Sequence, residues 1–149
     1  MNQSILLLLF GFINICYATR FSDCGSVTGK VKFVEVTNCP DNQDICVLKK
    51  GTTVDVKVHF TPNVRSQSLT ALLNAEIMDT PVPLPLDEPD ACKTGISCPV
   101  KKGKSYTYQN SLEILDFYPE IELSVKLELK DDQHKNMVCG SIKCKIQSN

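Results

Sequence analysis

The segment from Ile121 to Lys130, IELSVKLELK, alternates strictly between apolar and polar residues. A period of two places Ile, Leu and Val on one face of a β-strand and the charged and polar residues on the other. Residues 54–60, VDVKVHF, repeat the pattern. Each such strand has an apolar face that a second layer must cover. The chain is therefore expected to form β-sheets packed face to face.

Four further segments have the composition of shorter or less regular strands, at residues 31–36, 69–78, 106–114 and 138–146. The segment 69–78, LTALLNAEIM, also fits the spacing of a helix, but its strand-rich surroundings favour a strand. Turn signals such as Lys50-Gly51 and Tyr118-Pro119 separate these segments. Six or seven short antiparallel strands in about 130 residues are typical of an all-β sandwich of two sheets.

The N-terminus has the features of a signal peptide. The run from Ile5 to Ile15 is apolar apart from Gly11 and Asn14, which is too short to span a bilayer. Small residues precede the bond after Ala18, where we expect cleavage. The predicted organisation is a signal peptide at residues 1–18 followed by one domain at residues 19–149.

Removal of the signal peptide takes one of the eight cysteines, Cys16, and leaves seven, which suggests three disulfides and one free thiol. Cys139 and Cys144 lie on one predicted strand with Cα atoms roughly 16 Å apart, beyond the reach of a disulfide. Cys144 shares a face with apolar residues and is predicted to be the buried free thiol. The remaining cysteines fit two local bridges and one long-range bridge, namely Cys39–Cys46, Cys92–Cys98 and Cys24–Cys139.

The charged and nucleophilic residues do not indicate an enzyme. A formal net charge of −1 argues against nucleic-acid binding and against charge-driven membrane binding. His59 and His134 are expected at the surface, and the acidic pairs Asp87-Glu88 and Asp131-Asp132 in solvated turns. No motif for a metal, a cofactor or a nucleophile is present in the sequence. We expect no enzymatic activity, no cofactor and no metal site.

Two stretches place apolar residues where solvent-facing loops would not need them. In residues 81–86, PVPLPL, alternate prolines exclude a helix or a central strand and predict a stiff extended ridge at a sheet edge. In residues 111–120, SLEILDFYPE, apolar side chains crowd a strand end and a turn. Such patches mark a ligand mouth or a partner surface, unless they simply cap the core.

Three long segments carry a resemblance to a known family: DCGSVTGKVKFVEVTNCP, PVPLPLDEPDACKTGISCPVKKGKSYTYQNSLEI and FYPEIELSVKLEL. They resemble the Niemann–Pick type C2 (epididymal secretory protein) branch of the ML lipid-recognition domain family, over essentially residues 21–147. The resemblance implies an immunoglobulin-like β-sandwich of two antiparallel sheets with a lipid cavity between them. It also implies the same three disulfides.

The resemblance implies a binding site as well. The positions of the lipid mouth correspond to Val82, Leu84, Ile114, Tyr118 and Pro119. The positions of the tunnel walls correspond to Val36, Leu48, Val54, Val56 and Leu127. The sequence departs from the sterol-carrying pattern where Leu84 replaces a phenylalanine, Leu127 and Gly140 replace tryptophans, and Val54 replaces a tyrosine. The loss of aromatic volume is expected to widen or reshape the cavity.

The resulting functional hypothesis is a secreted carrier that holds a sterol or another hydrophobic small molecule and transfers it to membranes or acceptors. Transient membrane contact, a second lipid carrier or a receptor are the expected partners, and we expect a monomer. The alternatives are innate-immune recognition of microbial glycolipids, with Lys101, Lys102 and Lys104 as a basic rim, or carriage of hydrophobic semiochemicals. The one glycosylation sequon, Asn2-Gln3-Ser4, lies in the signal peptide, so secretion is favoured over lysosomal residence.

Overall fold

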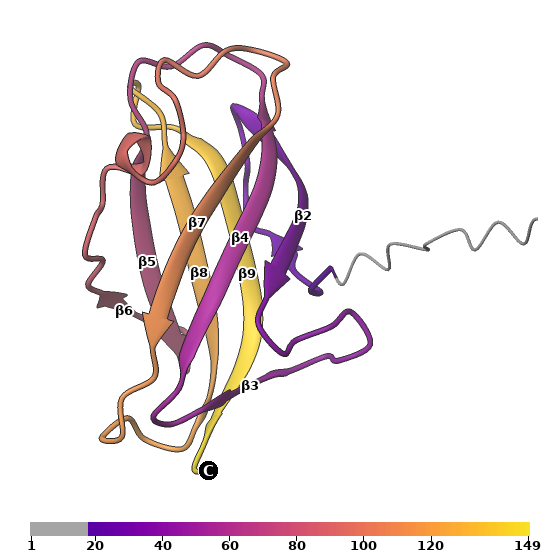
Figure 1. Cartoon of the computed structure of the whole chain (residues 1–149), viewed down its shortest axis with the longest axis vertical. Helices are drawn as coiled ribbons and strands as arrows, with labels where there is room; N and C mark the ends of the chain where they lie inside the picture. The colour runs from indigo at the N-terminus through magenta and orange to yellow at the C-terminus, as the bar shows by residue number, and fades with distance from the viewer. Residues whose placement is uncertain (1–17) are drawn as a thin grey trace, which may run out of the picture.

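Two sheets face one another in the computed structural model, which describes residues 18–149 (Figure 1). The smaller sheet has the order β2 (Gly29–Val36), β4 (Thr53–Pro62) and β7 (Tyr106–Glu113). The larger sheet has the order β1 (Ser22–Asp23), β9 (Asn136–Gln147), β8 (Glu122–Lys130), β5 (Thr70–Ile77) and β6 (Thr80–Leu84). A short strand, β3 (Cys46–Lys49), also pairs with β9, and one 3₁₀ turn, η1 (Ala91–Lys93), follows β6.

All six predicted strand segments are strands, and the all-β sandwich is confirmed. The segment 69–78 is strand β5 and not a helix. The sequence analysis missed two short strands, β1 and β3. Strand β3 pairs with β9 in parallel, while the other strand pairs are antiparallel. The predicted cleavage site follows Ala18, which is the first described residue. Residues 1–17 of the predicted signal peptide lie outside the described residues.

Residues 81–84 of the proline ridge belong to the edge strand β6 of the larger sheet, and Pro85 and Leu86 follow it. A two-residue turn of Met78 and Asp79, both with positive φ (51° and 63°), connects it to β5, the geometry of a tight hairpin. Proline lacks a backbone N–H, so it is tolerated where that side of the strand faces solvent. Pro81 and Pro83 lie at alternate positions of β6. They therefore leave a stiff edge to which a further strand cannot readily add.

The two sheets pack most tightly at one end, which we call the closed end and which is uppermost in Figure 1. Phe60, Leu129 and Met137 come from β4, β8 and β9 and are each 0% exposed. Gly29 begins β2 there, and a Cβ atom on it would lie only 2.5 Å from the carbonyl oxygen of Met137. The close approach of the two sheets therefore requires glycine at this position.

A buried carboxylate reinforces the closed end, contrary to the expectation of a solvated turn. Asp131 is 5% exposed. Its Oδ2 accepts a hydrogen bond of 2.8 Å from Thr28, and its Oδ1 accepts two of 2.9 Å from the N–H groups of Gln133 and Lys135. Burial by itself raises the pKa of Asp131, but these hydrogen bonds outweigh burial and lower the pKa below its usual value. The prediction for this residue was wrong because its partner Thr28 is distant in sequence.

Three disulfides join the pairs Cys24–Cys139, Cys39–Cys46 and Cys92–Cys98, as predicted. The first links Cys24, next to β1, to β9, at a sequence separation of 115. The other two close local loops before β3 and around η1. Cys144 is free and buried.

We expect Asp131→Ala to lower the free energy of unfolding by about 1–3 kcal/mol at pH 7, because three donors lose a charged acceptor. The lowered pKa means that this contribution is present above the usual aspartate pKa of 3.8 and is lost as the pH falls through the lower folded-state value. Urea unfolding at pH 7 and at pH values below 3.8 measures both effects.

Asp41→Ala is the control, because Asp41 is an exposed aspartate in the loop closed by Cys39 and Cys46. Its stability should match that of the unsubstituted protein at both pH values. A destabilisation by Asp131→Ala that persists unchanged at the lowest pH would contradict the assigned role.

Candidate functional site

Packing loosens along the strands towards the other end of the sandwich, which we call the open end. The inward row of β8 shows this gradient: Leu129 is 0% exposed and Leu127 is 8% exposed, whereas Val125 and Leu123 are only half-buried. The row is apolar throughout, so its chemistry does not cause the difference. The decreasing burial along this row shows that packing between the sheets is looser at the open end.

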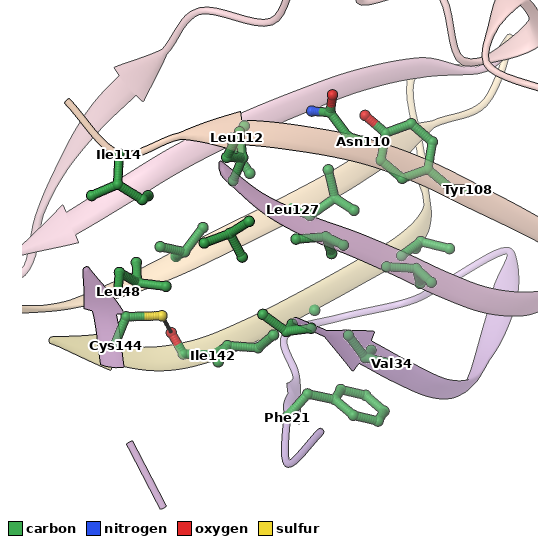
Figure 2. Close-up of a pocket in the computed structure, with 18 residues that line it drawn as sticks. Phe21, Val34, Leu48, Tyr108, Asn110, Leu112, Ile114, Leu127, Ile142 and Cys144 are labelled. Carbon is green, nitrogen blue, oxygen red and sulfur yellow. Dashed lines mark hydrogen bonds between the residues drawn. The ribbon is translucent and has the colours of Figure 1, made fainter. Parts of the chain in front are cut away.

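An inner cavity of about 60 Å³ lies between the sheets (Figure 2). Its walls come from both sheets, chiefly from strands β2, β4, β7, β8 and β9. The five predicted tunnel residues all line it: Val36, Leu48, Val54, Val56 and Leu127. The walls are almost entirely apolar, and no charged side chain among the described residues lines the cavity.

A larger groove of about 470 Å³ opens at the open end. The five predicted mouth residues all line it: Val82, Leu84, Ile114, Tyr118 and Pro119. Strand β6 with residues 85–87 provides one wall, and residues 111–119 provide another. The structure thus brings the two unusual apolar stretches of the sequence to one groove, although about 30 residues separate them in the chain.

The inner cavity and the outer groove share part of their walls. Leu48, Ile114 and Val125 line both, as do Asn110 and Leu112. The groove has the volume of a small-molecule site, roughly 300–1,000 Å³, whereas the inner cavity is far smaller. A lipid that reached from the groove into the cavity would have to push the shared side chains and the two sheets apart.

The sequence predicts a wider or reshaped cavity at the replaced aromatic positions, and the structure shows what lies beside one of them. Gly140 lines the inner cavity, as does Phe21 from the N-terminal segment. A Cβ atom on Gly140 would lie 3.9 Å from the ring of Phe21. The Phe21 ring therefore occupies part of the space beside Gly140.

Sequence analysis missed three of the wall residues that carry polar or reactive groups: Tyr108, Asn110 and Cys144. Tyr108 and Asn110 belong to the inward row of β7, together with Leu112 and Ile114 (Figure 2). The alternation of this strand could have identified both, because every second residue from Tyr106 onward faces the other sheet.

Cys144 lies in the wall of the inner cavity, and its Sγ is 3.6 Å from the carbonyl oxygen of Ile142, to which it donates (Figure 2). Burial raises the pKa of the Cys144 thiol to about 12. The thiol is therefore protonated at physiological pH, and its reactivity as a nucleophile is correspondingly low.

The other candidate residues lie outside the cavity and the groove. His59 is on the outer face of β4, 2.7 Å from Glu35 and 2.9 Å from Thr107, with its ring stacked on Phe33. It is thus partly buried in a polar cluster and not simply exposed as predicted. His134 is exposed in the β8–β9 turn, as expected.

The three lysines proposed as a basic rim, at residues 101–104, precede β7 and so lie at the closed end. Ile114 lies just beyond the opposite end of β7, roughly 25 Å away along the strand.

Within residues 18–149, no group of three or more acidic, histidine or cysteine side chains is placed to hold a metal ion. The same residues contain no helix long and apolar enough to cross a membrane.

Comparison with known proteins identifies the family to which this chain belongs. The ML-domain family model matches residues 18–146. The chain belongs to the ML-domain family. Within it the chain falls in the Niemann–Pick type C2 branch: it is 41% identical over 145 residues to the NPC intracellular cholesterol transporter 2 of Mus musculus, which covers 97% of this chain and 96% of that protein.

Three further comparisons extend this relationship. The ecdysteroid-regulated 16 kDa protein of Manduca sexta is 38% identical over 130 residues, 87% of this ML domain chain and 89% of that protein. The crystal structure of a Niemann–Pick type C2 protein from the Japanese carpenter ant superimposes with a TM-score of 0.82 at 27% identity, covering 86% of this chain and 99% of that one. Chicken MD-1 complexed with lipid IVa shares the fold, with a TM-score of 0.54 at 18% identity over 83% of this chain and 85% of that chain.

The buried, protonated thiol of Cys144 gives a prediction about its reactivity. The test uses protein that begins at residue 19, so that Cys16 is absent. Native protein should react with a thiol reagent such as iodoacetamide at least about a hundredfold more slowly than free cysteine, because the thiol is buried and protonated. Protein unfolded in guanidinium should react at one thiol per chain.

Mass spectrometry of the alkylated protein measures the labelling rate of the native protein and the number of thiols labelled in the unfolded protein. It also identifies the labelled residue. Cys144→Ala is the control and should take up no label in either state. Rapid labelling of Cys144 in the native protein would show that the cavity wall is open to solvent.

Proposed function

We propose that this protein is a carrier that binds a sterol or a lipid of similar size between its two sheets and delivers it to membranes or to an acceptor. The observation that carries the proposal is an apolar inner cavity that shares part of its wall with a largely apolar groove at the open end. Its relatives named as cholesterol transporters, at 37–41% identity over almost the whole chain, support the same function. The proposal includes no enzymatic step, because the thiol of Cys144 in the inner cavity is protonated at physiological pH and no histidine or carboxylate among the described residues lines that cavity.

Affinity in such a site comes from burial of apolar surface. Each 100 Å² of lipid surface removed from water contributes about 2.5 kcal/mol before the costs of ordering. The stiff edge strand β6 limits those costs, because proline fixes the backbone before the ligand arrives. Separation of the sheets at the open end is the remaining cost, and the loose packing of Leu123 and Val125 keeps that cost small.

Large apolar side chains surround the groove and suit transient contact with a membrane. Phe117 is 80% exposed and stands beside Tyr118, with the two rings in an edge-to-face arrangement and their centroids 5.2 Å apart. Met78, at the tip of the β5–β6 hairpin, is 93% exposed and follows Ile77 of the groove wall. Insertion of these side chains into a bilayer would place the groove at the lipid surface without any need for charge.

The position of the lysines favours the carrier over the glycolipid-recognition hypothesis. A rim that paired with lipid phosphates would have to border the groove, whereas Lys101, Lys102 and Lys104 belong to the closed end. We further propose that residues 1–18 are a signal peptide and that the protein is secreted. The apolar leader and the disulfide-bonded domain support this proposal.

Val82→Asp and Leu84→Asp should each weaken binding of a fluorescent sterol by at least about tenfold, because a carboxylate in the groove wall must be desolvated when the lipid enters. Val64→Asp is the matched control: Val64 is 38% exposed, Val82 is 41% exposed, and Val64 lies in the loop after β4 at the closed end. Far-UV circular dichroism checks that all three variants fold. Unchanged sterol binding by the two groove variants would contradict the assigned mouth.

Phe117→Ser and Met78→Ser should slow sterol transfer between phosphatidylcholine vesicles severalfold while equilibrium binding of the sterol changes by less than about twofold. The physical reason is that both side chains are exposed at the groove but contribute little to its walls. Val27→Ser is the control, since Val27 is 68% exposed at the closed end. Equal transfer rates for all variants and the unsubstituted protein would contradict a membrane contact at the open end.

A further inference from the structure

The inner cavity contains one feature that an apolar tunnel does not need. The hydroxyl of Tyr108 is buried and has no hydrogen-bond partner among the described residues. Tyr108 is 1% exposed, and its side chain lines the inner cavity. A buried polar atom without a partner is costly, and few native polar groups remain in that state. The Tyr108 hydroxyl is therefore an available partner for a polar atom that enters the cavity.

A second polar side chain stands next to it. Asn110 is the next inward-facing residue of β7, with its Cα roughly 7 Å from that of Tyr108. Figure 2 shows the Tyr108 oxygen on the side of its ring that faces Asn110. Asn110 Oδ1 accepts a hydrogen bond of 2.9 Å from the N–H of Ser111, so its NH₂ group remains as a donor. Asn110 and Tyr108 are the two cavity-lining residues whose side chains carry oxygen or nitrogen.

The neighbouring tyrosine of the same row shows that this arrangement is specific to Tyr108. The hydroxyl of Tyr106, two residues earlier, accepts a hydrogen bond of 2.8 Å from the N–H of Lys101. Tyr106 does not line the cavity. The inward row of β7 thus contains one tyrosine with a structural partner and one whose hydroxyl is directed at the cavity without one.

We infer that the Tyr108 hydroxyl and the Asn110 amide form a polar subsite inside the lipid cavity, which binds a neutral oxygen function on the leading part of the ligand. The inference deepens the proposed carrier function and rests on it. Both groups offer a donor, so the complementary atom is an acceptor oxygen of a hydroxyl or a carbonyl. An ionised group is excluded, because no charged side chain lines the cavity to compensate its burial.

The depth of the subsite in the cavity determines which part of the lipid it contacts. The groove opens at the end of β7 marked by Ile114, whereas Tyr108 lies three inward positions further towards the closed end. A lipid enters through the groove, so the end that enters first reaches Tyr108. The site therefore selects lipids that have an oxygen on that end over lipids whose leading end is purely hydrocarbon.

Three sterols that differ only in their oxygens test the inference: 5-cholestene with none, cholesterol with a ring hydroxyl, and 25-hydroxycholesterol with hydroxyls at both ends. Binding is measured by competition against a fluorescent sterol. The unsubstituted protein should bind the better of the two hydroxylated sterols roughly three- to tenfold more tightly than 5-cholestene. Tyr108→Phe and Asn110→Leu should reduce that preference without weakening the binding of 5-cholestene.

Tyr106→Phe is the matched control, because it removes a hydroxyl from the same strand and the same face but not from the cavity. It should retain the full preference and should lower the thermal unfolding midpoint, whereas Tyr108→Phe should leave the midpoint of the ligand-free protein unchanged or raise it. A merely structural role for Tyr108 would change stability and not the preference among sterols.

The outcomes are distinguishable. An equal preference in the unsubstituted protein and Tyr108→Phe overturns the polar subsite and leaves the carrier function intact. No preference in the unsubstituted protein overturns the subsite as well. Failure of the unsubstituted protein to bind any of the three sterols contradicts the proposed carriage of sterols itself.

Discussion

The close contact between the two sheets at the closed end is the constraint on which the rest of the structure depends. Gly29 lets β2 approach the backbone of Met137, and Asp131 ties Thr28 to the turn between β8 and β9. Fully buried side chains fill the space around these contacts. With one end fixed in this way, the sheets can separate at the other end without loss of the fold. A cavity and a groove then form in a protein whose inward faces are largely apolar.

Much of this arrangement is predictable because it repeats along the chain. Alternation defines the strands, and the prolines at 81 and 83 restrict β6 to an edge. The resemblance to a family adds the positions of the walls. The roles of Asp131 and Phe21 were not predicted, since the partners or neighbours that give each its role come from another part of the sandwich. Alternation along β7 indicates the inward position of Tyr108 and Asn110, but it does not indicate that the Tyr108 hydroxyl is buried without a hydrogen-bond partner. Such pairings depend on tertiary contacts, which a period of two does not encode.

The replaced aromatic residues illustrate the same limit. The loss of large side chains at Leu127 and Gly140 predicts a wider or reshaped tunnel, and the inner cavity has a volume of about 60 Å³. The chain itself fills part of the space through Phe21, and close packing of protein interiors favours such compensation. Specificity in this cavity therefore depends on how the walls yield to a ligand and on the few polar atoms they contain, and not on the static volume.

A crystal structure of the protein loaded with cholesterol is the most direct test of lipid binding between the sheets. We predict sterol density between β4 and β8 in contact with Leu48, Val54 and Leu127. The sheets should be further apart at the open end, with the contacts of Gly29 and Phe60 at the closed end unchanged. Sterol bound only in the outer groove, with the inner cavity still at about 60 Å³, would contradict this account.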